Sequence, residues 1–316
     1  MTAISSPYEE AVKVTPDIEE LHLGEASFYD LAEHFSNQAH FALLDSRTSE
    51  GGLGRYSFLT FAPFMIVNSK GGRVSVKEEY HQGETGKNIF DSLGQVFSQF
   101  QIPPGYGADV APFLGGGIGY FAYELGREIE ELPGRAFDDL KIPDCYVCFY
   151  NFVIILSHEQ GRVFLAYFDP VMTRPAFPKE AILREIKQAA AGSYSRDCAK
   201  SKWKGAPEGD ARGEFRSDFS REAYLDAINR IKEYIFAGDI YQANMTQRFQ
   251  TDLGGVDPWE LYKRLMEINP APFACYLNFD GVRVVSSSPE RFLKVEDRYV
   301  ETRPIKGTVR RGATPE

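Results

Sequence analysis

The sequence predicts an α+β fold that is mainly antiparallel β-sheet with a few helices. Strand-like runs flank the two-residue turns Gly71-Gly72 and Asp280-Gly281, as the two arms of a β-hairpin do. The 24 Phe and 17 Tyr residues suit extensive packing on sheet surfaces. Helical spacing of apolar residues occurs in a few segments between these runs.

The elements of the first two-thirds follow from these patterns in chain order. Apolar and β-branched runs predict strands, and apolar residues three or four positions apart predict helices. The strands are expected at residues 40–46, 65–70, 73–78, 145–156 and 162–168, and the helices at 88–100 and 180–191.

A change in composition predicts a domain boundary. Residues 192–213 are polar and contain Gly, without any apolar period, which is typical of a linker. We therefore expect a first domain at residues 1–191, a linker at 192–215 and a second domain at 216–316. The second domain shows no helix that closes its sheet, so we interpret it as the first part of a larger, C-terminally truncated domain.

Within residues 216–316 the same patterns predict two helices and several strands. Ser220 is placed to cap the first helix, which should end at Gly238. The expected elements are helices at 220–238 and 258–266, an imperfectly alternating strand at 239–253, and a hairpin formed by 274–279 and 282–288.

Charge and composition exclude several classes of partner. The formal net charge of −10 provides no basic face for nucleic acid, and no run of Lys and Arg suggests binding to a membrane surface. No basic and apolar leader or membrane-spanning stretch is evident, so we expect a cytoplasmic protein.

Common catalytic motifs are absent too. Cys145 and Cys148 have metal-site spacing, but within a strand they should point to opposite faces, so we interpret them as structural. The Gly cluster at 113–126 has neither dinucleotide-binding nor P-loop order, and a closely packed strand is expected there. No histidine follows His158, so acid, base and nucleophile in the second domain must come from other residue types.

Glu290 and Lys306 are the residues that could carry chemistry in the second domain. Glu290 follows a predicted strand, and Lys306 lies between the stiffening Pro304 and the small Gly307. A lysine needs burial or neighbouring cations such as Arg303 to become a neutral nucleophile. From the residues alone, an ordinary surface position for both remains open.

Five segments, in this order along the chain, resemble the chorismate-utilising enzymes, which include anthranilate synthase and aminodeoxychorismate synthase component I. The family fold implied is two large, mainly antiparallel sheets packed together and flanked by helices, with the C-terminal part missing. The similar segments are LLDS…GRYSFLTFAP (43–63), FLGGGIGYFAYELGR (113–127), AGDIYQANMTQRF (237–249), NPAPFACYLNF (269–279) and SSSPERFL…VETRPIKGTVRRG (286–312).

The resemblance also implies roles for single residues. A lysine at the position of Lys306 is characteristic of the aminodeoxychorismate synthase branch, where it is the covalent nucleophile. Gln242 matches members that use ammonia, whereas members that add water have a lysine there. Glu290 would assist departure of the C4 hydroxyl of chorismate, while Gly307 and Thr308 would contact the substrate. Anthranilate synthase component I is the nearest alternative.

The family further implies partners and an effector. Ammonia would come from a separate glutamine amidotransferase subunit, and Mg²⁺ would be required, with ligands beyond Glu316 and none in this chain. By resemblance to the tryptophan site of anthranilate synthases, the effector residues would be Ser46, Arg55, Tyr56, Pro272, Phe273 and Ala274. Simple packing of the two sheets is the alternative for these residues, and a non-catalytic tryptophan-binding or subunit-docking fragment is the alternative for the whole chain.

Overall fold

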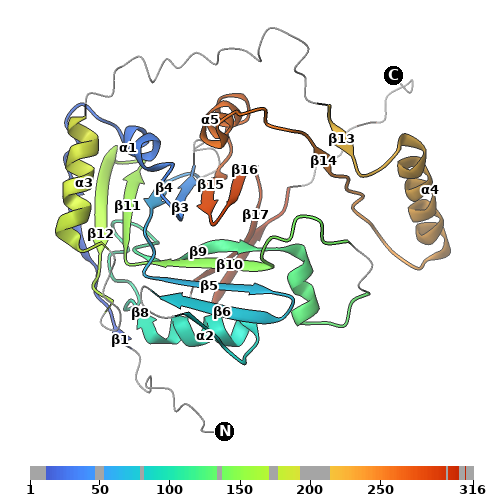
Figure 1. The fold of residues 1–316 in the computed structure, drawn as a ribbon, viewed down its shortest axis with the longest axis horizontal. Coiled ribbons are helices and arrows are strands. Elements are labelled where there is room, and N and C mark those ends of the chain that lie inside the picture. The colour runs from blue at the N-terminus through green and yellow to red at the C-terminus, as the bar shows by residue number, and fades with distance from the viewer. Residues whose placement is uncertain are drawn as a thin grey trace. The chain divides into compact units, whose positions relative to one another are not determined.

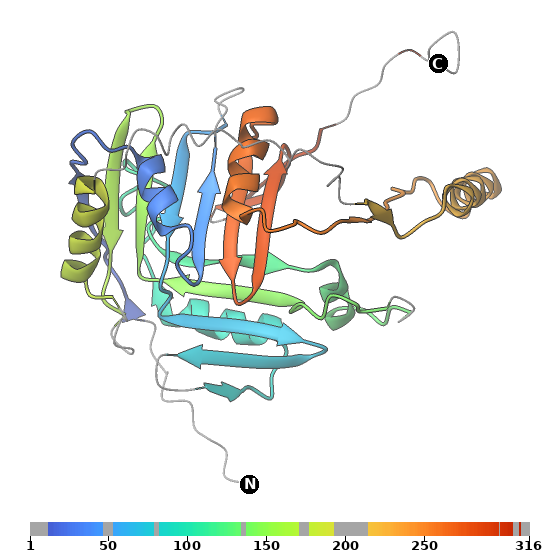
Figure 2. The ribbon, with the colours of Figure 1, turned by 45° about the horizontal axis from the view of Figure 1, so that its top comes forward.

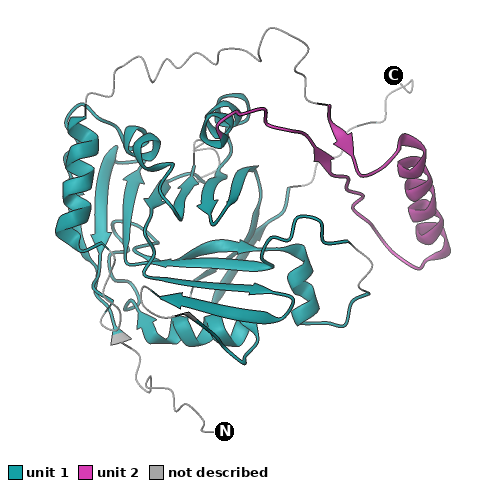
Figure 3. Cartoon of the chain, viewed as in Figure 1, with its two compact units in different colours: residues 1–193, 258–316 teal, residues 194–257 magenta. Residues whose placement is uncertain are grey.

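The computed structural model describes residues 12–46, 53–78, 82–133, 137–170, 177–192, 214–296, 298–305 and 310. The chain forms two compact units, one of Met1–Ser193 with Pro258–Glu316 and one of Tyr194–Asp257 (Figure 3). Among the helices of the described residues, none is long and apolar enough to cross a membrane.

The first unit contains a seven-stranded, fully antiparallel sheet. Its order is β16-β15-β3-β4-β11-β12-β2, so strands far apart in sequence are neighbours. The strands are β2 (Asp17–Leu21), β3 (Phe41–Asp45), β4 (Tyr56–Thr60), β11 (Phe152–Ser157), β12 (Arg162–Tyr167), β15 (Phe273–Phe279) and β16 (Val282–Ser288).

The first unit also contains a five-stranded antiparallel sheet, in the order β7-β6-β5-β10-β9 (Figure 1). Its strands are β5 (Met65–Lys70), β6 (Arg73–Glu78), β7 (Gln82–Glu84), β9 (Gly116–Phe121) and β10 (Cys145–Tyr150). Both hairpin turns predicted from sequence are present, because Gly71, Gly72, Asp280 and Gly281 all have positive φ between paired strands.

The two sheets pack face to face, and helices cover their outer faces (Figure 2). Side chains from β3 and β15 meet others from β5, β9 and β10 in one buried cluster between the sheets. On the far side of the seven-stranded sheet lie α1 (Phe28–Phe35), α3 (Lys179–Ala191) and α5 (Pro258–Ile268), and on the far side of the five-stranded sheet lies α2 (Ile89–Gln99). The predicted α+β class with two large antiparallel sheets is confirmed.

Short elements complete the unit. A parallel pair joins β1 (Val12–Lys13) to β8 (Phe100–Gln101), and a 3-10 helix spans Tyr123–Glu128. A separate two-stranded ladder pairs β17 (Arg291–Glu296) with β18 (Tyr299–Arg303).

The predicted single strand at residues 145–156 is wrong, because the chain changes sheets at Asn151. The backbone bends there, so β10 joins the five-stranded sheet and β11 the seven-stranded one. Asn151 is buried and donates its side-chain amide to the carbonyl of Phe168. A continuous apolar run cannot reveal this bend, since both halves are buried strands.

Packing explains the Gly cluster and the cysteine pair. A Cβ on Gly119 would lie 2.0 Å from the carbonyl oxygen of Tyr146, so the strand approaches β10 too closely for a side chain. Cys145 and Cys148 belong to clusters on opposite faces of the sheet, as predicted. Burial raises the pKa of both thiols to about 12.

The second unit has little regular structure around one helix. α4 (Arg221–Ala237) begins at the predicted cap, where the Ser220 hydroxyl accepts from the Ala223 amide, and ends at Gly238 with φ 83°. The predicted strand at 239–253 is wrong except for β14 (Phe249–Gln250), which pairs with β13 (Arg216–Ser217). No residue of α4 is buried.

Pairing of β15 with β3 groups residues 258–316 with the first unit. The division of the chain at a 192–215 linker, which the change in composition suggested, stays a prediction. Most of that linker lies outside the described residues.

Candidate functional site

The predicted catalytic residues lie in different parts of the chain. Glu290 follows β16 on an exposed segment of the first unit, where its carbonyl accepts a long hydrogen bond of 3.4 Å from Ser288 Oγ. Gln242 belongs to the second unit, on an exposed stretch without regular structure. Lys306, Gly307 and Thr308 lie outside the described residues. Their roles stay predictions.

By contrast, the six predicted effector residues line a single cleft in the first unit. The cleft has a volume of about 630 Å³. The structure thus brings together residues 46, 55 and 56 with residues 272–274, which are more than 200 positions away. They are Ser46, Arg55, Tyr56, Pro272, Phe273 and Ala274.

Strand pairing accounts for this arrangement. In the ladder between β3 and β15, Ala274 lies opposite Asp45, which places the end of β3 beside the start of β15. Ser46 Oγ donates a 2.6 Å hydrogen bond to the carbonyl of Pro272 and so fixes the two segments together. Arg55 stacks its guanidinium over the ring of Tyr56 and pairs with Glu159 at 3.1 Å.

Asp45, also on the cleft wall, is a residue that the prediction did not include. It is 2% exposed, and its carboxylate accepts hydrogen bonds from Tyr29 Oη (2.9 Å), Ser57 Oγ (2.8 Å) and Tyr262 Oη (2.8 Å). Ser57 Oγ also lies 2.8 Å from Nε2 of His158. Three hydroxyl donors compensate the buried carboxylate and tie α1, β4 and α5 to β3.

The β17–β18 ladder supplies a charged wall that the prediction also missed. Arg291 lies over the ring of Phe273, 5.2 Å from its centroid, and forms an ion pair with Glu301. Arg303 donates to both carboxylate oxygens of Glu301, at 2.9 and 3.2 Å. Hydrogen bonds from Arg303 and from Arg291 lower the pKa of the Glu301 carboxyl. In the sequence, charged residues alternate with other residues along these two strands, which indicates that the charged side chains share a face. The sequence does not indicate that this face lines the cleft.

The cleft therefore combines aromatic surface with charges of both signs. Tyr56 and Phe273 contribute aromatic rings, each with a guanidinium over one face, Asp45 is a buried carboxylate, and Arg291 and Arg303 share a single carboxylate partner. Two guanidiniums on one carboxylate leave the ladder wall locally positive. Such a cleft can accommodate a small molecule that carries an apolar ring, an ammonium and a carboxylate.

No group of three or more His, Cys, Asp or Glu side chains among the described residues is arranged to hold a metal ion.

The sequence matches the model of a known protein family. The family model described as chorismate binding enzyme matches residues 39–316. The chain belongs to this family of chorismate-binding enzymes.

Curated proteins with two different names have similar sequence identity to this chain. Aminodeoxychorismate synthase component 1 of Klebsiella aerogenes is 31% identical over 291 residues, covering 91% of this chain and 60% of the relative. Anthranilate synthase component 1 of Geobacillus stearothermophilus is 30% identical over 285 residues, covering 86% and 55%. The chain thus spans about 60% of the length of the first of these relatives.

A solved structure supports the fold. The anthranilate synthase component I of Streptococcus pneumoniae matches with a TM-score of 0.57 at 20% identity, over 89% of this chain and 60% of that one. At this identity the likeness concerns the fold, which has the two antiparallel sheets described above.

Proposed function

We propose that this chain is part of an aminodeoxychorismate synthase component I, which converts chorismate and ammonia to 4-amino-4-deoxychorismate for p-aminobenzoate and folate synthesis. The observation that carries the proposal is Lys306 in the motif RPIKGT, combined with Gln242 in YQANMTQRF. Membership of the chorismate-binding family and a relative of this name at 31% identity support it.

In the proposed reaction, a neutral Lys306 amine attacks C2 of the chorismate ring. The ring double bonds shift and the C4 hydroxyl departs as water, with a proton from Glu290. Ammonia then adds at C4, the electron shift reverses, and the lysine is expelled from C2. One difficult displacement is replaced by two easier ones, which is the benefit of covalent catalysis. Gln242, Gly307 and Thr308 are proposed to contact the substrate.

Substitution of the nucleophile tests this proposal. The longest polypeptide that the gene encodes is supplied with chorismate, ammonia and Mg²⁺, and the products are identified by mass spectrometry. Lys306→Ala should reduce aminodeoxychorismate formation at least a hundredfold, whereas Lys77→Ala, at an exposed lysine on β6, should not reduce it. Undiminished conversion by Lys306→Ala removes the nucleophile proposal.

The second candidate is anthranilate synthase component I, favoured by relatives of that name at 30% and 31% identity. The same assay separates the two functions. Anthranilate together with free pyruvate would identify this candidate, because aminodeoxychorismate retains the pyruvyl ether.

We further propose that the cleft described above binds tryptophan as an effector. Its ring surfaces and its mixture of carboxylate and guanidinium groups support a zwitterionic aromatic ligand. Calorimetry with tryptophan tests this: Ser46→Phe, which fills the cleft, should weaken binding at least tenfold, and Ser98→Phe on the exposed surface of α2 should not. Tryptophan binding without chorismate turnover would favour the non-catalytic alternative.

A further inference from the structure

The loop between β9 and β10 is far longer than a hairpin connection requires. Its base is closed by the pairing of Phe121 with Cys145 and by a 2.8 Å hydrogen bond from the Ala122 amide to the Asp144 carbonyl. Hairpin loops usually have about two to five residues, and longer loops within compact domains are commonly functional. We call residues 121–133 and 137–144, the described part of this excursion, the β9–β10 loop.

Large apolar side chains of this loop face solvent. Tyr123 is 97% exposed, Phe137 87% and Ile129 69%. Phe121, Leu132 and Leu140 are exposed as well. Single exposed apolar residues are ordinary, but six within one loop are typical of an interaction surface.

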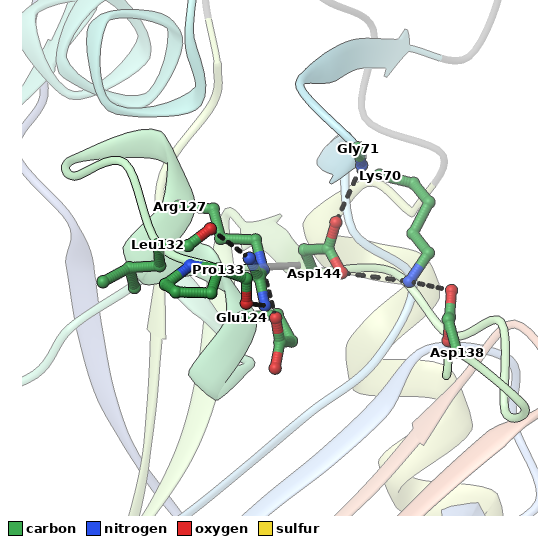
Figure 4. A network of polar contacts seen from close by, with 8 residues as sticks. All are labelled: Lys70, Gly71, Glu124, Arg127, Leu132, Pro133, Asp138 and Asp144. Carbon is green, nitrogen blue, oxygen red and sulfur yellow. Dashed lines mark hydrogen bonds and ion pairs between the residues drawn. The ribbon is translucent and has the colours of Figure 1, made fainter. Parts of the chain in front are cut away.

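Polar contacts hold this exposed loop in place (Figure 4). Arg127 pairs with Glu124 and donates to the carbonyls of Leu132 (2.8 Å) and Pro133 (3.2 Å). Its single guanidinium thus joins the start of the loop to its middle. Because the loop is fixed before any partner arrives, docking would cost little ordering entropy.

A second cation holds the other arm. Lys70 Nζ on β5 lies 2.7 Å from Asp138 and 3.0 Å from Asp144, whose other oxygen accepts from the Gly71 amide at 2.7 Å. Figure 4 shows these contacts beside the Arg127 cluster. Both arms of the loop are therefore anchored by polar side-chain contacts, and the first arm also by Leu125, which is buried in the core around α2.

The charge of the loop restricts which kind of partner surface can bind to it. Its described residues carry seven acidic side chains, against three basic ones when Lys70 is included. A second copy of this chain, with a formal net charge of −10, would be repelled on approach. An apolar surface with a basic rim is complementary to the loop.

We propose that the β9–β10 loop docks a separate protein subunit whose contact face is apolar and rimmed by Lys and Arg. This partner is the ammonia-supplying glutamine amidotransferase, an assignment that rests on the proposed function. Tyr123 and Phe137 are the proposed anchors, because they are the most exposed aromatic side chains of the loop and aromatic residues are enriched at protein interfaces.

Two variants and a control test the docking surface. The probe is the purified glutamine amidotransferase subunit of the same organism, titrated against the longest polypeptide that the gene encodes. The double variant Tyr123→Ser with Phe137→Ser should raise the Kd at least tenfold without lowering the Tm. Glu130→Lys with Glu131→Lys should slow association most at low salt. Ile268→Ser, an exposed apolar residue at the end of α5, should change neither quantity.

Activity separates failure of this proposal from failure of the proposed function. The double variant should lose glutamine-dependent turnover and keep ammonia-dependent turnover. An unchanged Kd overturns the docking surface. So does a wild-type chain that self-associates through the loop, or a Tyr123 ring that is already shielded from solvent in the isolated polypeptide. If free ammonia gives no aminodeoxychorismate while the double variant still loses binding, docking stands and the proposed function fails.

Discussion

The helices α4 and α5 both carry apolar residues at helical spacing, but their surroundings differ. α5 buries Trp259, Tyr262 and Met266 against the seven-stranded sheet, whereas α4 buries none of its residues. Both begin and end close to where the sequence predicts. An apolar stripe therefore predicts that a segment is helical. It does not indicate which surface the helix packs against, or whether it packs against any part of the chain.

The largest expected difference between the helices concerns apolar packing. Met266→Ala on α5 leaves a cavity in the main core and should lower the free energy of unfolding by about 3 kcal/mol. Ile231→Ala on α4, at a half-exposed position, should lower it by less than about 1 kcal/mol. Urea unfolding monitored by fluorescence measures both, and equal losses would contradict the contrast.

A polar contact also attaches α5 to the sheet. Asp45→Asn removes one acceptor from the buried site that receives Tyr262 Oη, and should cost about 2 kcal/mol. Asp226→Asn on α4 is the matched control, because this carboxylate is exposed, and its effect should stay within about 0.5 kcal/mol. If Tyr262→Phe adds its full cost to Asp45→Asn in a double-mutant cycle, the two groups are not coupled.

Helix caps give a smaller and more selective test. Ser27 forms a capping box on the docked helix α1, and Ser220 caps α4. Replacing either by Ala should cost its helix about 1 kcal/mol. For Ser27→Ala we expect a lower global Tm. Ser220→Ala should speed hydrogen exchange within α4 and leave the Tm of the first unit unchanged, and a lowered Tm would show that α4 folds together with that unit.

Ionisation of the buried thiols should not affect the stability of the protein at neutral pH. Burial raises the pKa of Cys145 and Cys148 from an ordinary value of 9.0 to about 12, so the folded protein keeps protons that the unfolded chain loses. Stability should therefore fall as the pH rises from about 9 towards 12, and not below. In a Cys198→Ser, Cys275→Ser background, which leaves only the two buried thiols, labelling at pH 8 should be slow in the native state and fast in urea. Rapid native labelling would contradict this.

Local sequence determined most of the secondary structure. Turn residues fixed both predicted hairpins, and Ser220 and Gly238 bounded α4, because these features depend on neighbouring residues alone. The motifs also led to the chorismate-binding family and to six residues that line one cleft, whose role as an effector site stays a prediction.

Only the tertiary structure decided how these elements meet. Asn151 divides one apolar run between two sheets, and residues 239–253 remain mostly irregular despite their strand-like composition. The burial of Asp45 beneath three hydroxyls and the position of Arg291 over Phe273 depend on partners up to 217 positions away. Such long-range contacts leave no periodic pattern in the sequence. The spacing of residues indicates which side chains share a face of a helix or strand, but not which other element packs against that face.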